Sequence, residues 1–182
     1  IPKKTATTPQ LPKKDDVVKD DKTSVKVEVS DVKKKEVKYK EPANKKAKTV
    51  SIPATVKING VTYKVTKIAD NAFKNNKTVT KVTVGSNIKT IGKNAFYKCT
   101  KLKTVKIGKN VTTIGSNAFK GCKKLKTIKI TSTKLTSKTV SKKAFKGLTK
   151  ATTIKVPKKK LKAYKKLFKQ KGLSSKVKVK GY

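Results

Sequence analysis

Apolar residues recur with a 23-residue period through the second half of the chain. Phe73, Phe96 and Phe119 lie 23 residues apart, each directly after an alanine, and Phe145 follows as a fourth copy after 26 residues. A unit this short cannot bury its own apolar face, so each copy must pack on its neighbours. The pattern therefore predicts a solenoid in which the four phenylalanine rings form an internal column.

Each copy also ends in an apolar triplet that predicts a short strand. Segments 105–107 and 128–130 both consist of an apolar residue, a lysine and a second apolar residue. Because side chains alternate across a strand, the apolar pair would point inward and the lysine outward. The predicted repeats form one region over 65–160 and cover residues 65–87, 88–110, 111–133 and 134–160.

The N-terminal flank divides into two predicted parts. Residues 1–24 contain three of the six prolines and little apolar content, which predicts a disordered linker or tail. Residues 25–64 include alternating apolar and polar runs, which predict an N-terminal cap of β-strands. Within this part, Asn59-Gly60 separates two alternating runs and predicts a two-residue β-hairpin turn. We expect the hairpin to cover the open N-terminal end of the solenoid.

Residues 161–182 are predicted to cap the other end. After Pro157, apolar residues recur at helical spacing as far as Phe168, and Gly172 is typical of the position just past a helix. These signals predict an amphipathic helix over about 158–171, followed by a short strand at 177–179. A lysine-rich amphipathic helix could instead lie on an anionic membrane, but the exposed end of a solenoid requires closing.

Two segments carry a resemblance to a known family. Residues 91–102 and 114–125 share the pattern Ile-Gly-x-Asn-Ala-Phe-x-x-Cys-x-x-Leu. This pattern resembles the BspA-type leucine-rich repeats of bacterial surface and secreted proteins, over about residues 50–160. The resemblance implies a leucine-rich repeat solenoid with a parallel β-sheet on its concave face and turns or helical pieces on its convex side. The last repeat departs from the family pattern, with Leu148 where cysteine is frequent.

The charge of the chain is extreme and unevenly distributed. It contains 51 basic residues, all of them lysine, against 9 acidic ones. From residue 42 onward, 39 lysines are opposed by Asp70 alone. Such a field attracts polyanions and opposes compaction of the chain. The excess could also be a solvated surface without a ligand.

Lysines at the outward positions of the predicted strands are the candidate ligand-binding residues. One group lies between the inward residues of successive strands, and a second precedes the same strands. On a parallel sheet, each group forms a row with spacings of about 5 Å, inside a Debye length of about 8 Å. A row of this kind repels itself unless an anion bridges it. The residues are Lys106, Lys129 and Lys155 in the first group and Lys103 and Lys126 in the second.

Residues for acid–base chemistry are scarce. Histidine is absent, and beyond Glu41 only Asp70 carries a carboxylate. No phosphate-binding loop, nucleophile motif or zinc motif occurs, so we expect no catalytic residues, no metal site, no cofactor and no enzymatic activity. Cys99 and Cys122 share one repeat position, which predicts inert buried thiols, although an extracellular disulfide between them stays open.

The resemblance and the charge together imply an interaction or adhesion module that acts outside the cell or at the bacterial cell surface. Its expected partners are a host surface protein, an acidic glycan or an anionic cell-wall polymer. An accessory or spacer domain without a specific ligand is an alternative. Nucleic-acid binding is a weaker alternative and would be sequence-blind, because lysine without arginine lacks bidentate base readout.

The chain has no run of 18 apolar residues that could cross a bilayer. It also lacks methionine, which predicts that it begins inside a longer polypeptide. No signal peptide is visible in the sequence. The oligomeric state stays open.

Overall fold

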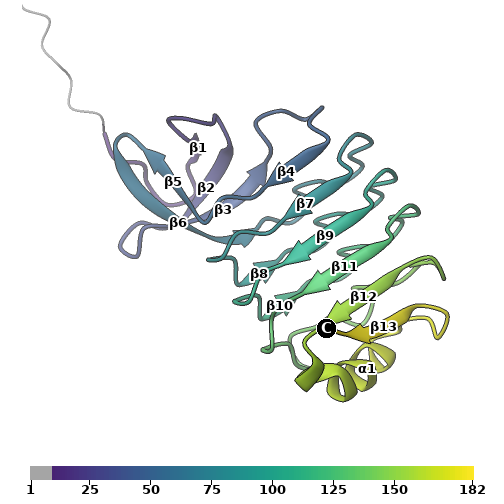
Figure 1. The fold of residues 1–182 in the computed structure, drawn as a ribbon. Helices are drawn as coiled ribbons and strands as arrows, with labels where there is room; N and C mark the ends of the chain where they lie inside the picture. The colour runs from purple at the N-terminus through teal and green to yellow at the C-terminus, as the bar shows by residue number, and fades with distance from the viewer. Residues whose placement is uncertain (1–9) are drawn as a thin grey trace, which may run out of the picture.

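Two β-sheets run along a stack of coils in the computed structural model, which describes residues 10–182 (Figure 1). One sheet has six parallel strands: β4 (Thr49–Ser51), β7 (Lys81–Thr83), β9 (Thr104–Ile107), β11 (Thr127–Ile130), β12 (Thr153–Val156) and β13 (Lys178–Gly181). The other sheet contains β1 (Val17–Lys19), β2 (Lys26–Asp31), β3 (Glu36–Glu41), β5 (Thr55–Ile58), β6 (Val61–Ile68), β8 (Thr90–Ile91) and β10 (Thr113–Ile114). The chain is therefore a parallel β-solenoid with its core between the two sheets.

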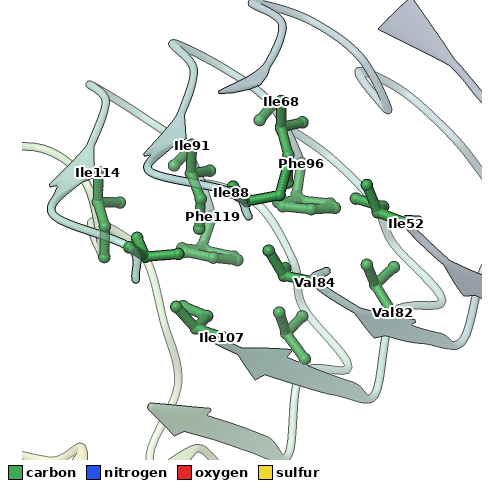
Figure 2. Close-up of a cluster of buried hydrophobic side chains, with 14 of the residues drawn as sticks. Ile52, Ile68, Val82, Val84, Ile88, Ile91, Phe96, Ile107, Ile114 and Phe119 are labelled. Atoms are coloured by element: carbon green, nitrogen blue, oxygen red, sulfur yellow. The ribbon is translucent and has the colours of Figure 1, made fainter. Parts of the chain in front are cut away.

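Alternation along each strand builds this core. In the six-stranded sheet, Val105 pairs with Val82 on one side and with Ile128 on the other, and all three side chains are fully buried. In the second sheet, Ile91 pairs in the same way with Ile68 and Ile114. Figure 2 shows these isoleucines in a row on successive coils, beside the rings of Phe96 and Phe119. The predicted inward triplets are confirmed.

An aromatic column runs through the centre of the stack. The rings of Phe73 and Phe96 stack with centroids 5.1 Å apart, and successive rings continue at 5.3 Å and 5.8 Å. The predicted column of four phenylalanines is confirmed and is longer than expected. Tyr39 of β3 stacks on Phe73 at 5.7 Å, and Phe168 of the C-terminal helix meets Phe145 edge-on at 5.0 Å.

The segment before the repeats is ordered further toward the N-terminus than the sequence predicted. Residues 1–9 lie outside the described part of the chain, but the prediction of disorder is wrong for residues 10–24, because β1 pairs antiparallel with β2. Asp20 is buried, and its carboxylate accepts hydrogen bonds from the backbone N–H groups of Lys57 and Thr23, at 2.8 and 2.7 Å. This segment has no large apolar face. Its order comes instead from backbone pairing with β2 and from the hydrogen bonds of the Asp20 carboxylate.

The predicted hairpin at Asn59-Gly60 is confirmed. Ile58 pairs with Val61, and both turn residues have positive φ angles, 50° and 80°, as a two-residue hairpin turn requires. Its second strand, β6, also joins the stack, where it is parallel to β3 on one side and β8 on the other. The hairpin is thus part of the sheet, and β3, β2 and β1 extend that sheet beyond it.

The solenoid has more rungs than the four predicted repeats. Those repeats supply β7, β9, β11 and β12 of the six-stranded sheet, while β4 and β13 add a rung at each end. The hairpin separates β4 from β7, and a helix separates β12 from β13. These insertions interrupt the 23-residue period and hide the two outer rungs from a search for that period.

The C-terminal cap contains the predicted helix. A short 3-10 helix, η1 (Lys158–Lys160), leads into α1 (Leu161–Gln170), whose Tyr164, Leu167 and Phe168 are buried against the last coils. The Tyr164 hydroxyl donates to the Ser132 carbonyl at 3.0 Å, which ties the helix to the end of the third repeat. Among the residues that the structure describes, no helix has the length and apolarity needed to span a membrane.

Ion pairs stabilise the N-terminal end of the stack. Glu28 of β2 pairs with Lys38 and Lys40 of β3, and Glu41 pairs with Lys26 and Lys45. Hydrogen bonds from the two lysines at each site hold the pKa of Glu28 and that of Glu41 below their ordinary values. Both carboxylates are therefore charged and paired near neutral pH.

Removal of one ring from the column should destabilise the whole stack. Phe96→Ala is expected to lower the free energy of unfolding by about 3 to 5 kcal/mol, because the fully buried ring leaves a cavity between two others. Urea unfolding monitored by circular dichroism measures this change. Tyr97→Ala, at the next and half-exposed position, should cost less than about 1 kcal/mol. Equal losses in the two variants would contradict the internal column.

The N-terminal end of the stack, where Glu28 lies, should lose stability in acid. Because the pKa of folded Glu28 lies below the ordinary 4.5, this group stabilises the fold above pH 4.5 and loses that contribution as pH falls further. Glu28→Gln should be less stable than the wild type at pH 7, and the gap should close as pH approaches 3. Thermal melts of both proteins across this range test it, and a gap that widens in acid would rule the ion pairs out as the cause.

Candidate functional site

The outward side of the six-stranded sheet, here called the strand face, carries a row of lysines on consecutive strands. Lys129 of β11 pairs in register with Lys106 of β9 and with Lys155 of β12, and Lys155 pairs with Lys180 of β13. The predicted alignment of the first three is confirmed, and Lys180 adds a fourth. We call Lys106, Lys129, Lys155 and Lys180 the lysine ladder.

Hydroxyl side chains occupy most of the other outward positions of the strand face. The ladder position is occupied by Thr83 on β7 and by Ser51 on β4. A second row lies one outward position earlier and contains Thr104, Thr127 and Thr153 on β9, β11 and β12, flanked by Lys81 on β7 and Lys178 on β13. The ladder is thus confined to the four strands nearest the C-terminus, although Lys81 adds an exposed lysine on β7.

The other two predicted site residues, Lys103 and Lys126, form a flanking pair. Both are exposed and directly precede β9 and β11, and the Lys126 N–H donates to the Lys103 carbonyl at 2.9 Å. The next residue in this row is Thr152, which is buried and donates its hydroxyl to the Leu125 carbonyl at 2.7 Å. This row therefore ends after two lysines, and the row of Thr104 and Thr127 separates it from the ladder.

The charge of the ladder is not neutralised by the protein. Among residues 10–182, every ion pair uses one of five carboxylates at the N-terminal end: Glu28, Asp31, Glu36, Glu41 and Asp70. No acidic residue follows Asp70 in the sequence. Neighbouring strands lie about 4.8 Å apart, and two like charges 4 Å apart repel by about 1 kcal/mol even in bulk water. Anion binding along the ladder would relieve this repulsion.

Tyr182 is a strand-face residue that sequence reasoning missed. It directly follows β13, and the residue is 43% exposed. The Lys129 Nζ lies 4.3 Å from the ring centroid, and the Tyr182 hydroxyl donates to the Ile130 carbonyl at 3.2 Å. Burial of the hydroxyl raises the pKa of Tyr182. The alternation of lysine and valine at 178–180 was the signal that could have placed Lys180 and Tyr182 on this face.

The two cysteines are interior residues, as predicted. Cys99 and Cys122 are free and buried, and their Sγ atoms donate to the carbonyls of Phe73 and Phe96, each at 3.0 Å. The neighbouring Cys122 thiol and burial raise the pKa of Cys99. Within the described part of the chain, no group of three or more metal-binding side chains comes together.

Comparison with known proteins agrees with the repeat architecture. Residues 43–175 match the family described as BspA type leucine rich repeat region, in six copies, and the long sheet has six strands. Curated protein sequences give no significant match.

Solved structures of similar shape come from bacteria. A leucine-rich repeat protein from Bacteroides capillosus is 25% identical, with a TM-score of 0.62 over 74% of this chain and 94% of that chain. One from Bacteroides ovatus is 24% identical, with a TM-score of 0.58 over 80% of this chain and 38% of that chain. The pneumococcal vaccine antigen PcpA is 18% identical, with a TM-score of 0.52 over 93% of this chain and 47% of that chain. This chain thus spans less than half the length of the last two.

The family match covers most of the chain, and its six copies agree with six parallel rungs around one aromatic column. The chain belongs to the BspA-type leucine-rich repeat family.

Proposed function

We propose that the chain is a non-catalytic interaction module of a bacterial surface or secreted protein, and that its lysine ladder binds an anionic polymer. The observation that carries the proposal is the register of four lysines on consecutive parallel strands. The sequence supplies no acid after Asp70 to neutralise them. An external polyanion is the natural counter-charge for such a row.

The ladder has the shape of a site for a linear ligand. Its lysines lie on different strands, so the row runs across β9, β11, β12 and β13 along the axis of the stack. Charges spaced by about 4.8 Å along a line fit an extended polymer better than a compact anion. Lys103 and Lys126 directly precede β9 and β11 and add charge at the start of these strands.

We propose a non-catalytic role because the side chains that usually carry catalysis are missing, buried or already paired. Histidine is missing from the sequence, and both cysteine thiols are buried. Glu28, Glu36 and Glu41 are engaged in ion pairs with lysines at the N-terminal end, away from the ladder. A surface or extracellular setting is supported by the bacterial surface and secreted proteins in which BspA-type repeats are found.

Three other partners or roles give different experimental outcomes. A spacer domain would bind no polyanion at physiological salt. A host surface protein would need an acidic face and would be recognised by its own shape. Sequence-blind nucleic-acid binding is permitted by the net charge, but lysine provides point charges without the planar fork that reads bases.

The ladder should contribute more to polyanion binding than an equal number of lysines elsewhere. We expect the combined variant Lys106→Gln, Lys129→Gln, Lys155→Gln and Lys180→Gln to bind heparin at least about tenfold more weakly than the wild type. The slope of log affinity against log salt should fall in magnitude by about three, because fewer counter-ions are released. Isothermal titration calorimetry across a salt series measures both quantities.

A matched control removes the same net charge from another surface. Lys142→Gln, Lys146→Gln, Lys162→Gln and Lys166→Gln change exposed lysines of the last coil and of α1. This variant should lose less than about threefold in affinity, since its lysines form no row on the strand face. Equal losses in the two variants would mean that bulk charge, not the ladder, determines binding. A wild-type protein without affinity at physiological salt would favour the spacer role.

A further inference from the structure

We propose that Tyr182 makes the C-terminal part of the lysine ladder selective for an acidic polysaccharide, a polyanion built from sugar rings. This inference rests on the proposed function, because it assigns the chemical class of the ligand that the ladder binds. It depends on the position of Tyr182, on its exposure and on its contact with Lys129.

Tyr182 lies on the strand face beside the ladder. Its N–H donates to the Val156 carbonyl at 3.1 Å, and its carbonyl accepts from the Lys158 N–H at 3.2 Å, so it continues the pairing of β13 with β12. Two residues after Lys180, it falls on the same outward side of the sheet. Its hydroxyl reaches the Ile130 carbonyl at the end of β11, so the ring extends across β12.

The exposure of Tyr182 is unusual for an aromatic residue in this chain. All five phenylalanines and three of the five tyrosines are buried. Tyr97 is half-buried, and Tyr182 has 43% of its surface exposed. Packing in the hydrophobic core therefore does not explain why an aromatic residue is present at position 182. It is the one aromatic surface on a face otherwise made of lysine, serine and threonine.

Lys129 connects the ring to the ladder. Its Nζ lies over the Tyr182 ring, 4.3 Å from the centroid, and makes a cation–π contact. An anionic group that draws this ammonium into an ion pair also uncovers the ring face. The site then offers a cation and a flat aromatic surface side by side, within the span of one monomer of a polymer.

Acidic sugars carry both matching features on one ring. Their carboxylate or sulfate groups pair with lysines, and the C–H face of the pyranose packs on an aromatic side chain. A polyphosphate chain has the charge without a ring. Nucleic-acid bases can also stack on tyrosine, but single-strand binding surfaces use several aromatic residues in succession, whereas the strand face has one. The geometry therefore favours a polysaccharide.

The test compares Tyr182 variants on three polyanions: heparin, inorganic polyphosphate and single-stranded poly(dT). Tyr182→Ala and Tyr182→Leu should each weaken heparin binding by about three- to tenfold, the range expected for one aromatic contact. Binding of polyphosphate and poly(dT) should change by less than about twofold. Tyr182→Phe keeps the ring and should retain most of the heparin affinity. Leucine keeps bulk at the end of β13, which separates loss of the aromatic ring from loss of packing.

Tyr97→Ala is the matched control. Tyr97 also has lysines over its ring, with Nζ of Lys98 at 5.4 Å and Nζ of Lys120 at 5.8 Å, but it lies beside Phe96 in a turn and not on the strand face. Its removal should leave binding of all three polyanions unchanged. A loss for Tyr97→Ala equal to that for Tyr182→Ala would overturn the assignment.

Two other results would also overturn it. Equal losses of heparin and polyphosphate affinity in Tyr182→Ala would mean that the ring only positions Lys129. A larger loss for poly(dT) would mean that the ring reads bases. The proposed function fails separately, when the fourfold ladder variant binds heparin as tightly as the wild type. In that case the ladder does not contribute to heparin binding, and Tyr182 cannot determine its selectivity.

Discussion

The register between successive coils is the constraint on which both the core and the surface of this molecule depend. Aromatic rings stack from coil to coil with centroids 5.1 to 5.8 Å apart between Tyr39 and Phe145, and the inward valines and isoleucines pair strand by strand. A shift of one residue would turn every apolar side chain of a strand outward. The same register places outward residues of one type above each other, so a repeated lysine becomes a row of charge.

Core stability and surface charge therefore oppose each other along the stack. At the N-terminal end, carboxylates such as Glu28 and Glu41 each pair with two lysines and offset the repulsion. Toward the C-terminus no acid is present, and burial of the column must outweigh the repulsion between neighbouring lysines. This asymmetry leaves one end of the strand face available to an external polyanion, and the exposed Tyr182 lies at that end.

The period of 23 residues was sufficient to predict the column, the inward triplets and the alignment of Lys106, Lys129 and Lys155, because each depends only on position within a repeat. The rungs β4 and β13 could not be found in this way, since the hairpin and α1 interrupt the period. Order in residues 10–24 depends on pairing with distant backbone, as the bond from Lys57 to Asp20 illustrates. Tyr182 acquires its role from contacts with β11, which no local pattern contains.

A crystal structure of the protein with a bound heparin oligosaccharide tests the link between register and function most directly. The oligosaccharide is expected to lie along the axis of the stack, with its anionic groups on Lys106, Lys129, Lys155 and Lys180 and one sugar ring on Tyr182. An oligosaccharide bound instead to the lysines of α1 or of the turns, with the strand face empty, would contradict the view that the aligned rungs create the binding site.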